Sequence, residues 1–290
     1  MTPAYVYALL SKDVYKSNNA PLSCELRGRG WLRHELTAHE EAHFAKGFYG
    51  RIYWNKKRNE IVVAFRGTVR GEMENWKKNF EIVFLKKKGR YHDNANDLVD
   101  RAKKASRGFN LRANYRLTLT GHSLGGMMAM ILAAENPQLR AIAFDSPGVG
   151  GVDGIPITEI KEYQESKMDC GGSAGGFNAI FSAGNGCRVT SWPVHKTVKK
   201  QYSNIQNIIV SGSALSSLGT HVGHVSALNL KTKACEADEL VEVYFSSAPS
   251  LPGEYAGHLV RRAVNCAVIE LHQITHITEK LRQQVIEIAV

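Results

Sequence analysis

The chain has 290 residues and a formal net charge of +10, with 43% hydrophobic and 22% charged residues. This composition is ordinary for a globular protein that can bury a sizeable core, and no apolar run is long enough to span a membrane. The amino terminus lacks the basic start, apolar core and cleavage site of a secretory signal. We therefore expect a cytoplasmic protein, or one exported by a signal-independent route.

The first elements follow from hydrophobic periodicity. A helix is predicted over residues 4–16, and a polar, irregular stretch follows over 17–45. Two strands are predicted over 47–54 and 60–66, joined by a turn at 55–59. The second strand is nearly all apolar, which is typical of a strand covered on both faces.

The later elements alternate between helix and strand. We predict a helix at 93–107, strands at 115–120, 140–144 and 205–210, and helical spacing over 254–288 with a break near Gln273 or Thr275. This alternation predicts an α/β fold with a mainly parallel sheet flanked by helices. Because no linker stands out, we expect a single domain over residues 1–290.

The motif G-H-S-L-G at 121–125 stands between the strand at 115–120 and a run of helix formers at 127–135. This context is the one that G-x-S-x-G requires to be a nucleophile elbow, in which the two glycines leave room for a tight turn. Ser123 would then lie at the tip, where the helix N-terminus also directs its amide groups. The alternative is a glycine-rich loop with an incidental serine, since the chain has 26 glycines.

Four segments together resemble class 3 lipases of the α/β-hydrolase fold, in order and in spacing, over about residues 5–150. They are 61–68, 75–76, 120–126 and 144–150. The resemblance implies hydrolysis of lipid carboxyl esters, of phospholipase A or lipase type, through an acyl-enzyme intermediate.

The resemblance also implies roles for individual residues. Thr68 and Leu124 would give the two backbone N–H groups of the oxyanion hole, and a segment near 69–90 would form a lid. Thr68 has the alternative of being an ordinary strand-end residue.

The serine needs a base, and in this fold the histidine comes late in the chain. The segment around His272 resembles the one that carries the base in relatives of this lipase group, so His272 is predicted. His276, His258 and His224 stay open as alternatives.

The catalytic acid departs from the simple family pattern. Class 3 lipases resemble one another in placing an aspartate after a later strand, where this chain has Ser213 and no carboxylate over 207–215. Asp145 instead follows the strand at 140–144, which we expect beside the elbow strand, with its end on the same face as Ser123. This arrangement resembles the pancreatic-type lipases.

Asp145 is therefore the predicted acid, in a triad with Ser123 and His272. Its alternative role is to cap the turn that follows it, as aspartate often does. Asp153, Asp169 and Asp238 are weaker candidates.

No metal and no cofactor are predicted, because no cysteine and histidine cluster has zinc-site spacing. The five cysteines are too scattered for a disulfide framework. Cys170 and Cys187 bracket a glycine-rich loop and could pair in an oxidising compartment, although the odd count favours free thiols.

Basic residues cluster at 56–58, 77–78, 86–90, 101–104 and 196–200. Such clusters attract polyanions, and the chain has no recognisable nucleic-acid-binding motif. We expect a lipid or phospholipid substrate and an anionic membrane surface as partners, and no nucleic acid. Two other functions stay open: a catalytically silent lipase-like module that binds membranes or a partner, and a thioesterase or small-ester esterase.

Overall fold

The computed structural model describes most of the first 156 residues and shorter stretches after them. The described residues are 2–17, 20–37, 44, 48–67, 89–156, 160–163, 168–169, 188–189, 195–198, 202–210, 213, 215–216, 218–228, 230 and 273–289.

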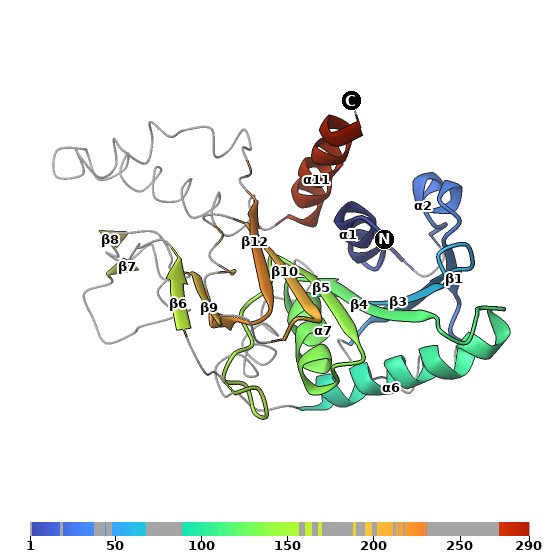
Figure 1. Cartoon of the computed structure of the whole chain (residues 1–290), viewed down its shortest axis with the longest axis horizontal. Coiled ribbons are helices and arrows are strands. Elements are labelled where there is room, and N and C mark those ends of the chain that lie inside the picture. The colour runs from blue at the N-terminus through green and yellow to red at the C-terminus, as the bar shows by residue number, and fades with distance from the viewer. Residues whose placement is uncertain are drawn as a thin grey trace.

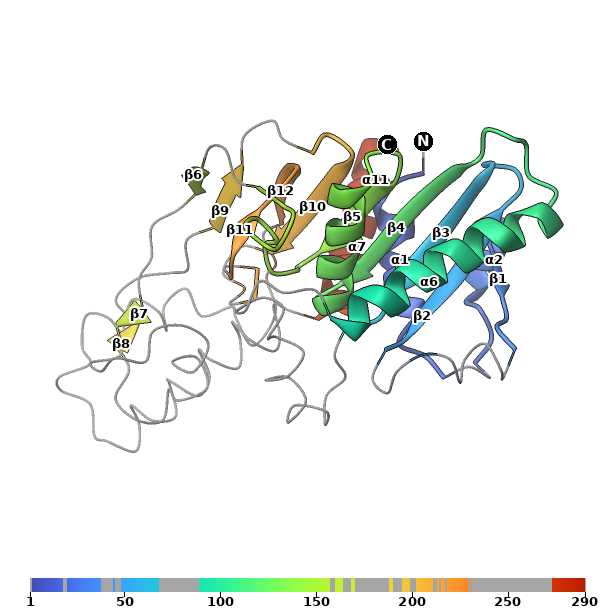
Figure 2. The ribbon, with the colours of Figure 1, turned by 90° about the horizontal axis from the view of Figure 1, so that it is seen from below.

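A seven-stranded sheet forms the centre, in the order β1-β2-β3-β4-β5-β10-β12. Its strands are β1 (Leu32–His34), β2 (Gly50–Asn55), β3 (Glu60–Phe65), β4 (Arg116–His122), β5 (Arg140–Phe144), β10 (Ile205–Val210) and β12 (His224–Leu228). The strand β2 is antiparallel to both of its neighbours, β1 and β3, whereas β3, β4, β5, β10 and β12 run parallel to one another. Figure 2 shows this succession of strands from one end of the sheet to the other.

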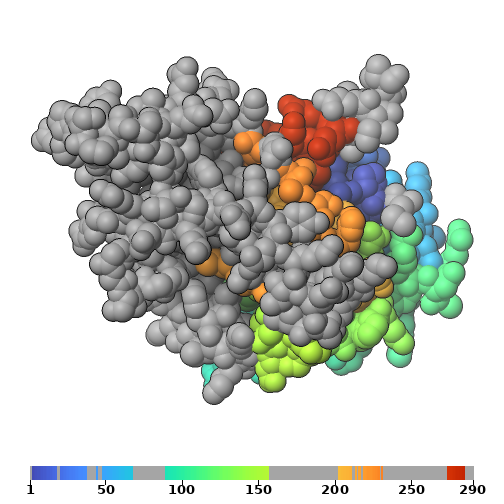
Figure 3. Space-filling model, turned by 60° about the vertical axis from the view of Figure 1, so that its left-hand side comes forward, coloured from blue at the N-terminus to red at the C-terminus, as the bar shows by residue number. Residues whose placement is uncertain are grey.

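Helices cover both faces of the sheet (Figure 1). One face carries α6 (Arg90–Ala105) and α7 (Leu124–Glu135), and the other carries α1 (Ala4–Asp13) and α11 (Ile274–Ala289). The helix α11 lies beside α1, as Figure 3 also shows for the red and dark blue segments. The short α2 (Cys24–Gly28) and the 3₁₀ turn η1 (Ser106–Gly108) complete the described helices.

Five short strands lie outside the central sheet. They are β6 (Ile160–Tyr163), β9 (His195–Val198) and β11 (Thr220–His221), which form one small sheet, and β7 (Met168–Asp169) and β8 (Arg188–Val189), which form another.

The core divides into two layers because both faces of the parallel strands are covered. All six residues of β3 are buried, and alternate ones pack into opposite layers: Val63 faces α6 and α7, whereas Val62 and Ala64 face α1. A strand buried on both faces has no need of polar alternation, which explains its apolar sequence.

The parallel strands give the sheet two distinct edges. We call the end where β3, β4, β5 and β10 begin the amino edge, and the end where they finish the carboxyl edge. In open parallel sheets of this kind, ligands bind outside the carboxyl ends of the strands.

A buried carboxylate secures the amino edge. Glu60 is fully buried and accepts hydrogen bonds from Thr2 (2.6 Å), Tyr7 (2.5 Å), Thr118 (3.0 Å) and Arg116 (3.3 Å). These partners come from the N-terminal segment, α1 and β4, so Glu60 ties the first helix to the middle of the sheet. Burial and the neighbouring charge of Glu60 raise the pKa of Tyr7 to about 12.

The expected fold class, a mainly parallel sheet flanked by helices, is confirmed. The strands at 140–144 and 205–210 match β5 and β10, and the helix at 93–107 corresponds to α6. The expectation of an irregular stretch over 17–45 was wrong, since α2 and β1 lie within it, and the short strands outside the central sheet were not predicted. The helix α11 begins at Ile274, and the predicted helical spacing before Gln273 falls outside the described residues, so the break near Gln273 or Thr275 stays a prediction.

Other expectations stay predictions. Residues 69–88 of the expected lid segment lie outside the described residues. Cys170 and Cys187 also lie outside them, and the division of the chain into domains stays a prediction. Within the described part of the chain, no helix combines the length and apolar character needed to cross a bilayer.

Candidate active site

Ser123 stands at the sharp turn between β4 and α7, at the carboxyl edge. Its backbone has φ 59° and ψ −131°, a conformation that costs a non-glycine residue on the order of 1–3 kcal/mol. The strain persists because the turn is held on both sides: the Ser123 N–H donates to Phe144 O (3.0 Å), and the Met127 N–H donates to Ser123 O (3.1 Å).

The Ser123 hydroxyl does not serve the helix that it precedes. Serine at this position usually caps the first turn, but Ser123 makes no side-chain cap hydrogen bond. Such a strained, non-capping serine is what a nucleophile elbow requires.

The end of β3 closes tightly on this turn, and two glycines make the approach possible. A Cβ atom on Gly67 would lie 2.9 Å from the Ser123 Cβ and 2.6 Å from the His122 carbonyl oxygen. A Cβ on Gly125 would overlap the carbonyl oxygen of Phe65. The chain that leaves β3 therefore passes directly beside the serine.

Tyr15, which follows α1, fastens these two segments to each other. Its hydroxyl accepts a hydrogen bond from the Gly67 N–H (3.0 Å) and lies 3.1 Å from His122 Nδ1. The rings of Tyr15 and His122 meet edge to face, with centroids 6.0 Å apart. Burial raises the pKa of Tyr15, so its hydroxyl stays protonated and can donate to the imidazole.

The predicted oxyanion residues adjoin this turn. Leu124 is the first residue of α7, and the leading N–H groups of a helix have no partner within the helix. Thr68 directly follows Gly67 but lies outside the described residues.

Asp145 directly follows β5, the strand next to the elbow strand, as predicted. His122 pairs with Phe144 in the parallel ladder, so Ser123 and Asp145 leave neighbouring strands at the same level. Strands in a sheet are about 4.8 Å apart. Like Ser123, Asp145 has a left-handed backbone, with φ 41°.

The Asp145 carboxylate is fully buried and accepts hydrogen bonds from the last residue of β10 and from Ser213, which follows that strand. The Val210 N–H donates to Oδ1 (3.1 Å), and the Ser213 hydroxyl donates to Oδ2 (2.6 Å). These bonds lead across the sheet rather than into the turn after Asp145, where the Gly148 N–H donates to Leu218 O (2.7 Å).

Two of the four candidate histidine bases lie among the described residues. His272 and His258 lie outside the described residues. His224 is the first residue of β12 and thus belongs to the amino edge, a strand length from the elbow. His276 lies in the first turn of α11 and is half-buried, with its Nδ1 4.0 Å from Glu279 Oε2.

The direction of α11 bears on these candidates. Burial raises the pKa of Tyr5 at the start of α1, and the positive charge of Arg282, further along α11, opposes this rise, which places these two residues near each other. The helix α1 runs from Glu60 at the amino edge, which Tyr7 contacts, to the elbow, which Tyr15 contacts. The packed helices are therefore antiparallel, and α11 begins towards the carboxyl edge.

The structure thus places Ser123 and Leu124 after β4 and Asp145 at the same level after the neighbouring strand β5. Sequence reasoning did not find Tyr15, whose contacts at the elbow are with residues 52 and 107 positions away. It noted Ser213 as the place where relatives carry an acid, but not its contact with Asp145. No local pattern signals either contact.

The comparison with known families gives one decisive match. A sequence model of the Tle-like phospholipase domain, a phospholipase-like family, matches residues 6–162, more than half of the 290-residue chain. The chain belongs to the Tle-like phospholipase family. The matched region contains the elbow and Asp145, and the expected lipase-like family of the α/β-hydrolase fold is confirmed.

Solved structures with a similar fold come from fungal proteins. A mutant of MDLA from Penicillium cyclopium is 15% identical with a TM-score of 0.42, covering 79% of this chain and 78% of its own. The Lip2 lipase of Yarrowia lipolytica is 13% identical with a TM-score of 0.45, covering 78% and 77%. The triacylglyceride lipase of Rhizomucor miehei is 13% identical with a TM-score of 0.41, covering 77% and 78%.

A search among curated proteins gives no significant sequence match. The assignment of the family rests on the domain match.

Proposed function

We propose that this Tle-like phospholipase is a serine acyl hydrolase that cleaves carboxyl esters of lipids, of phospholipase A or lipase type. The observation that carries the proposal is Ser123, held in a strained, non-capping conformation between β4 and the first amide of α7. Neither fold stability nor helix capping requires this geometry, whereas nucleophilic attack does.

The proposed reaction has two halves. A histidine, His272 in this proposal, takes the proton of the Ser123 hydroxyl as its oxygen attacks the ester carbonyl carbon. The N–H groups of Leu124 and Thr68 stabilise the oxyanion, and the histidine protonates the departing alcohol. Water, activated by the same histidine, then releases the fatty acid from the serine.

Asp145 completes the proposed triad. A buried carboxylate beside the elbow can hold the imidazole in one tautomer and stabilise its protonated form during attack. His272 precedes α11 by two positions, and α11 begins towards the carboxyl edge, which supports His272 over His224. His276 and His258 stay open as alternatives.

The test is hydrolysis of a panel of phospholipids and acylglycerols by the wild type and by Ser123→Ala. The wild type should release fatty acid, and the variant should lose nearly all of this activity while folding normally. Equal release by both proteins would exclude the serine mechanism. A folded wild type that binds lipid but releases no fatty acid from any lipid, thioester or small ester would favour the silent binding module.

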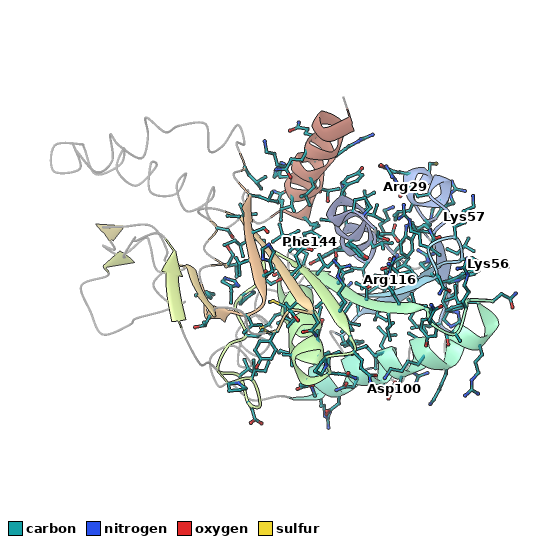
Figure 4. The ribbon with its side chains drawn as sticks, viewed as in Figure 1. Arg29, Lys56, Lys57, Asp100, Arg116 and Phe144 are labelled. Carbon is teal, nitrogen blue, oxygen red and sulfur yellow. The ribbon has the colours of Figure 1, made fainter. Side chains whose placement is uncertain are left out.

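We also propose that the basic cluster at 86–88, just before α6 in the sequence, guides the protein to anionic membranes. Lys56 and Lys57 lie in the turn before β3, at the amino edge with Arg116 and away from Phe144 (Figure 4). The cluster at 86–88 instead directly precedes α6, whose Tyr91 hydroxyl donates to Arg66 O (2.6 Å) near the elbow.

Reversing the charges at 86–88 should therefore weaken binding to anionic vesicles, and wild-type binding should fall with salt, since exposed charges are screened beyond about 10 Å at 0.1 M. The matched control reverses Lys56 and Lys57 and should weaken binding less. Equal binding of the wild type to neutral and anionic vesicles would contradict this proposal.

A further inference from the structure

The segment after β10 is built around the Asp145 carboxylate. Ser213 is fully buried and lies 68 positions from Asp145 in the sequence, yet its hydroxyl donates to Oδ2 at 2.6 Å. This is the short distance of a charge-assisted O–H···O⁻ bond, which is stronger than a bond between neutral groups. The Val210 N–H binds the other carboxylate oxygen.

The described residues of this segment, Ser213 and Ser216, make further hydrogen bonds of their own. The Ser213 N–H donates to Val210 O (3.1 Å), and the Ser216 hydroxyl donates to Val210 O (3.2 Å). The buried His221 donates to Ser216 O from Nε2, while its Nδ1 lies 2.6 Å from Asn207 Nδ2 in β10. Both backbone polar groups of Ser213 are thus hydrogen-bonded, its N–H to Val210 O and its carbonyl oxygen to the Ser216 hydroxyl (3.3 Å).

The carboxylate needs such support because its own torsion is soft. The rotation of an aspartate carboxyl group about its last bond is broad and roughly two-fold. Two donors placed on different oxygens of the carboxylate select one orientation of it.

We propose that Ser213 is a positioning residue that holds the Asp145 carboxylate in the orientation in which it receives the catalytic imidazole. This chain thus has, at the place where related lipases carry their acid, the side chain that supports an acid on the neighbouring strand. The inference rests on the proposed function and deepens it. Ser213 acts through Asp145 and does not itself touch the reacting atoms.

A purely structural role for Ser213 makes a different prediction. If the hydroxyl only secures the loop, its loss should harm the enzyme equally with or without the carboxylate. If it acts through Asp145, its loss should matter only while Asp145 is present. A double-mutant cycle distinguishes the two roles.

The experiment measures kcat and KM for a soluble p-nitrophenyl ester in the wild type, Ser213→Ala, Asp145→Ala and the double variant. We expect Ser213→Ala to lower kcat about 10-fold in the wild type with little change in KM, because a hydrogen bond to a charged group is lost. In the Asp145→Ala background the same change should alter kcat less than about 2-fold.

Ser216→Ala is the matched control, since its hydroxyl binds backbone carbonyls of the same segment and its effect should be the same in both backgrounds. Two further variants guard against misfolding of Ser213→Ala. Ser213→Thr keeps the hydroxyl and should retain activity, whereas Ser213→Cys has a weak donor of similar size and should lower kcat.

The outcomes separate this inference from the proposed function. If the wild type shows no Ser123-dependent hydrolysis, the proposed function itself fails. If the wild type is active but Ser213→Ala lowers kcat equally in both backgrounds, or Ser213→Cys is as active as Ser213→Thr, the positioning role is overturned.

Discussion

Two fully buried carboxylates at opposite edges of one sheet are used in different ways. Glu60, at the amino edge, occupies a regular strand and accepts four hydrogen bonds that tie α1 to the sheet. Asp145, at the carboxyl edge, has a left-handed backbone with φ 41°, and Ser123, at the end of the neighbouring strand, has φ 59°. A buried network in which every polar group is hydrogen-bonded stabilises the fold, whereas strained backbone conformations cluster at functional sites.

The largest expected effect follows from removing the charge at the carboxyl edge. Asp145→Asn keeps the size of the side chain but cannot stabilise a protonated imidazole, so kcat should fall by about 10³–10⁴. Steady-state hydrolysis of a soluble ester measures this, with circular dichroism as the control for folding. Unchanged turnover in Asp145→Asn would remove Asp145 from the triad.

The matching change at the amino edge should affect stability instead of turnover. Glu60→Ala leaves buried donors without an acceptor, and we expect the free energy of unfolding to fall by about 3 kcal/mol. Below its unfolding transition this variant should keep kcat within about 2-fold of the wild type. If Glu60→Ala were as stable as the wild type, or folded but inactive, Glu60 would not have the purely stabilising role expected at the amino edge.

Alkaline pH should lower the free energy of unfolding through Tyr7 at the amino edge. The pKa of Tyr7 is raised to about 12, chiefly by burial and then by Glu60, so its contribution to stability is complete below pH 10 and is lost as pH rises towards 12. The loss amounts to at most about 1.4 kcal/mol per pH unit. Urea unfolding across this range should show the decline, and Tyr7→Phe should flatten it; identical slopes would argue against a buried Tyr7.

A smaller effect should reveal the strain at the elbow. Because Ser123 has φ 59°, Ser123→Gly should be more stable than Ser123→Ala by about 1 kcal/mol. The matched pair at Ser11, inside α1, should show the opposite order, since glycine destabilises a helix interior by about 1 kcal/mol relative to alanine. Thermal unfolding of the four variants tests this, and the same order at both positions would contradict a strained elbow.

The parts of the fold that sequence reasoning predicted are those with strong local patterns. The strand β5 is apolar after its first residue, and β10 ends in the apolar run 208–210. The elbow has its glycines, strand and helix within a few residues of Ser123. The strand β1 was missed because three residues carry no periodicity. The neighbouring Arg51 helps to shape this region through Lys16 O and Ser17 O, contacts more than 30 positions away.

The candidate site divides in the same way. Ser123 and Asp145 could be proposed from local motifs and from the rule that successive parallel strands are adjacent. Tyr15 and Ser213 act over 107 and 68 positions, respectively, and their contacts depend on how α1 and the segment after β10 pack on the sheet. Only the three-dimensional arrangement connects them to the elbow.

The most direct test of the account is to label the wild type with a fluorophosphonate and locate the adduct by peptide mass spectrometry. We predict a single covalent adduct on Ser123, slower labelling in Asp145→Asn and no labelling in Ser123→Ala. A folded, unlabelled wild type, or an adduct on a different residue, would contradict the claim that the strained serine at the carboxyl edge is the nucleophile.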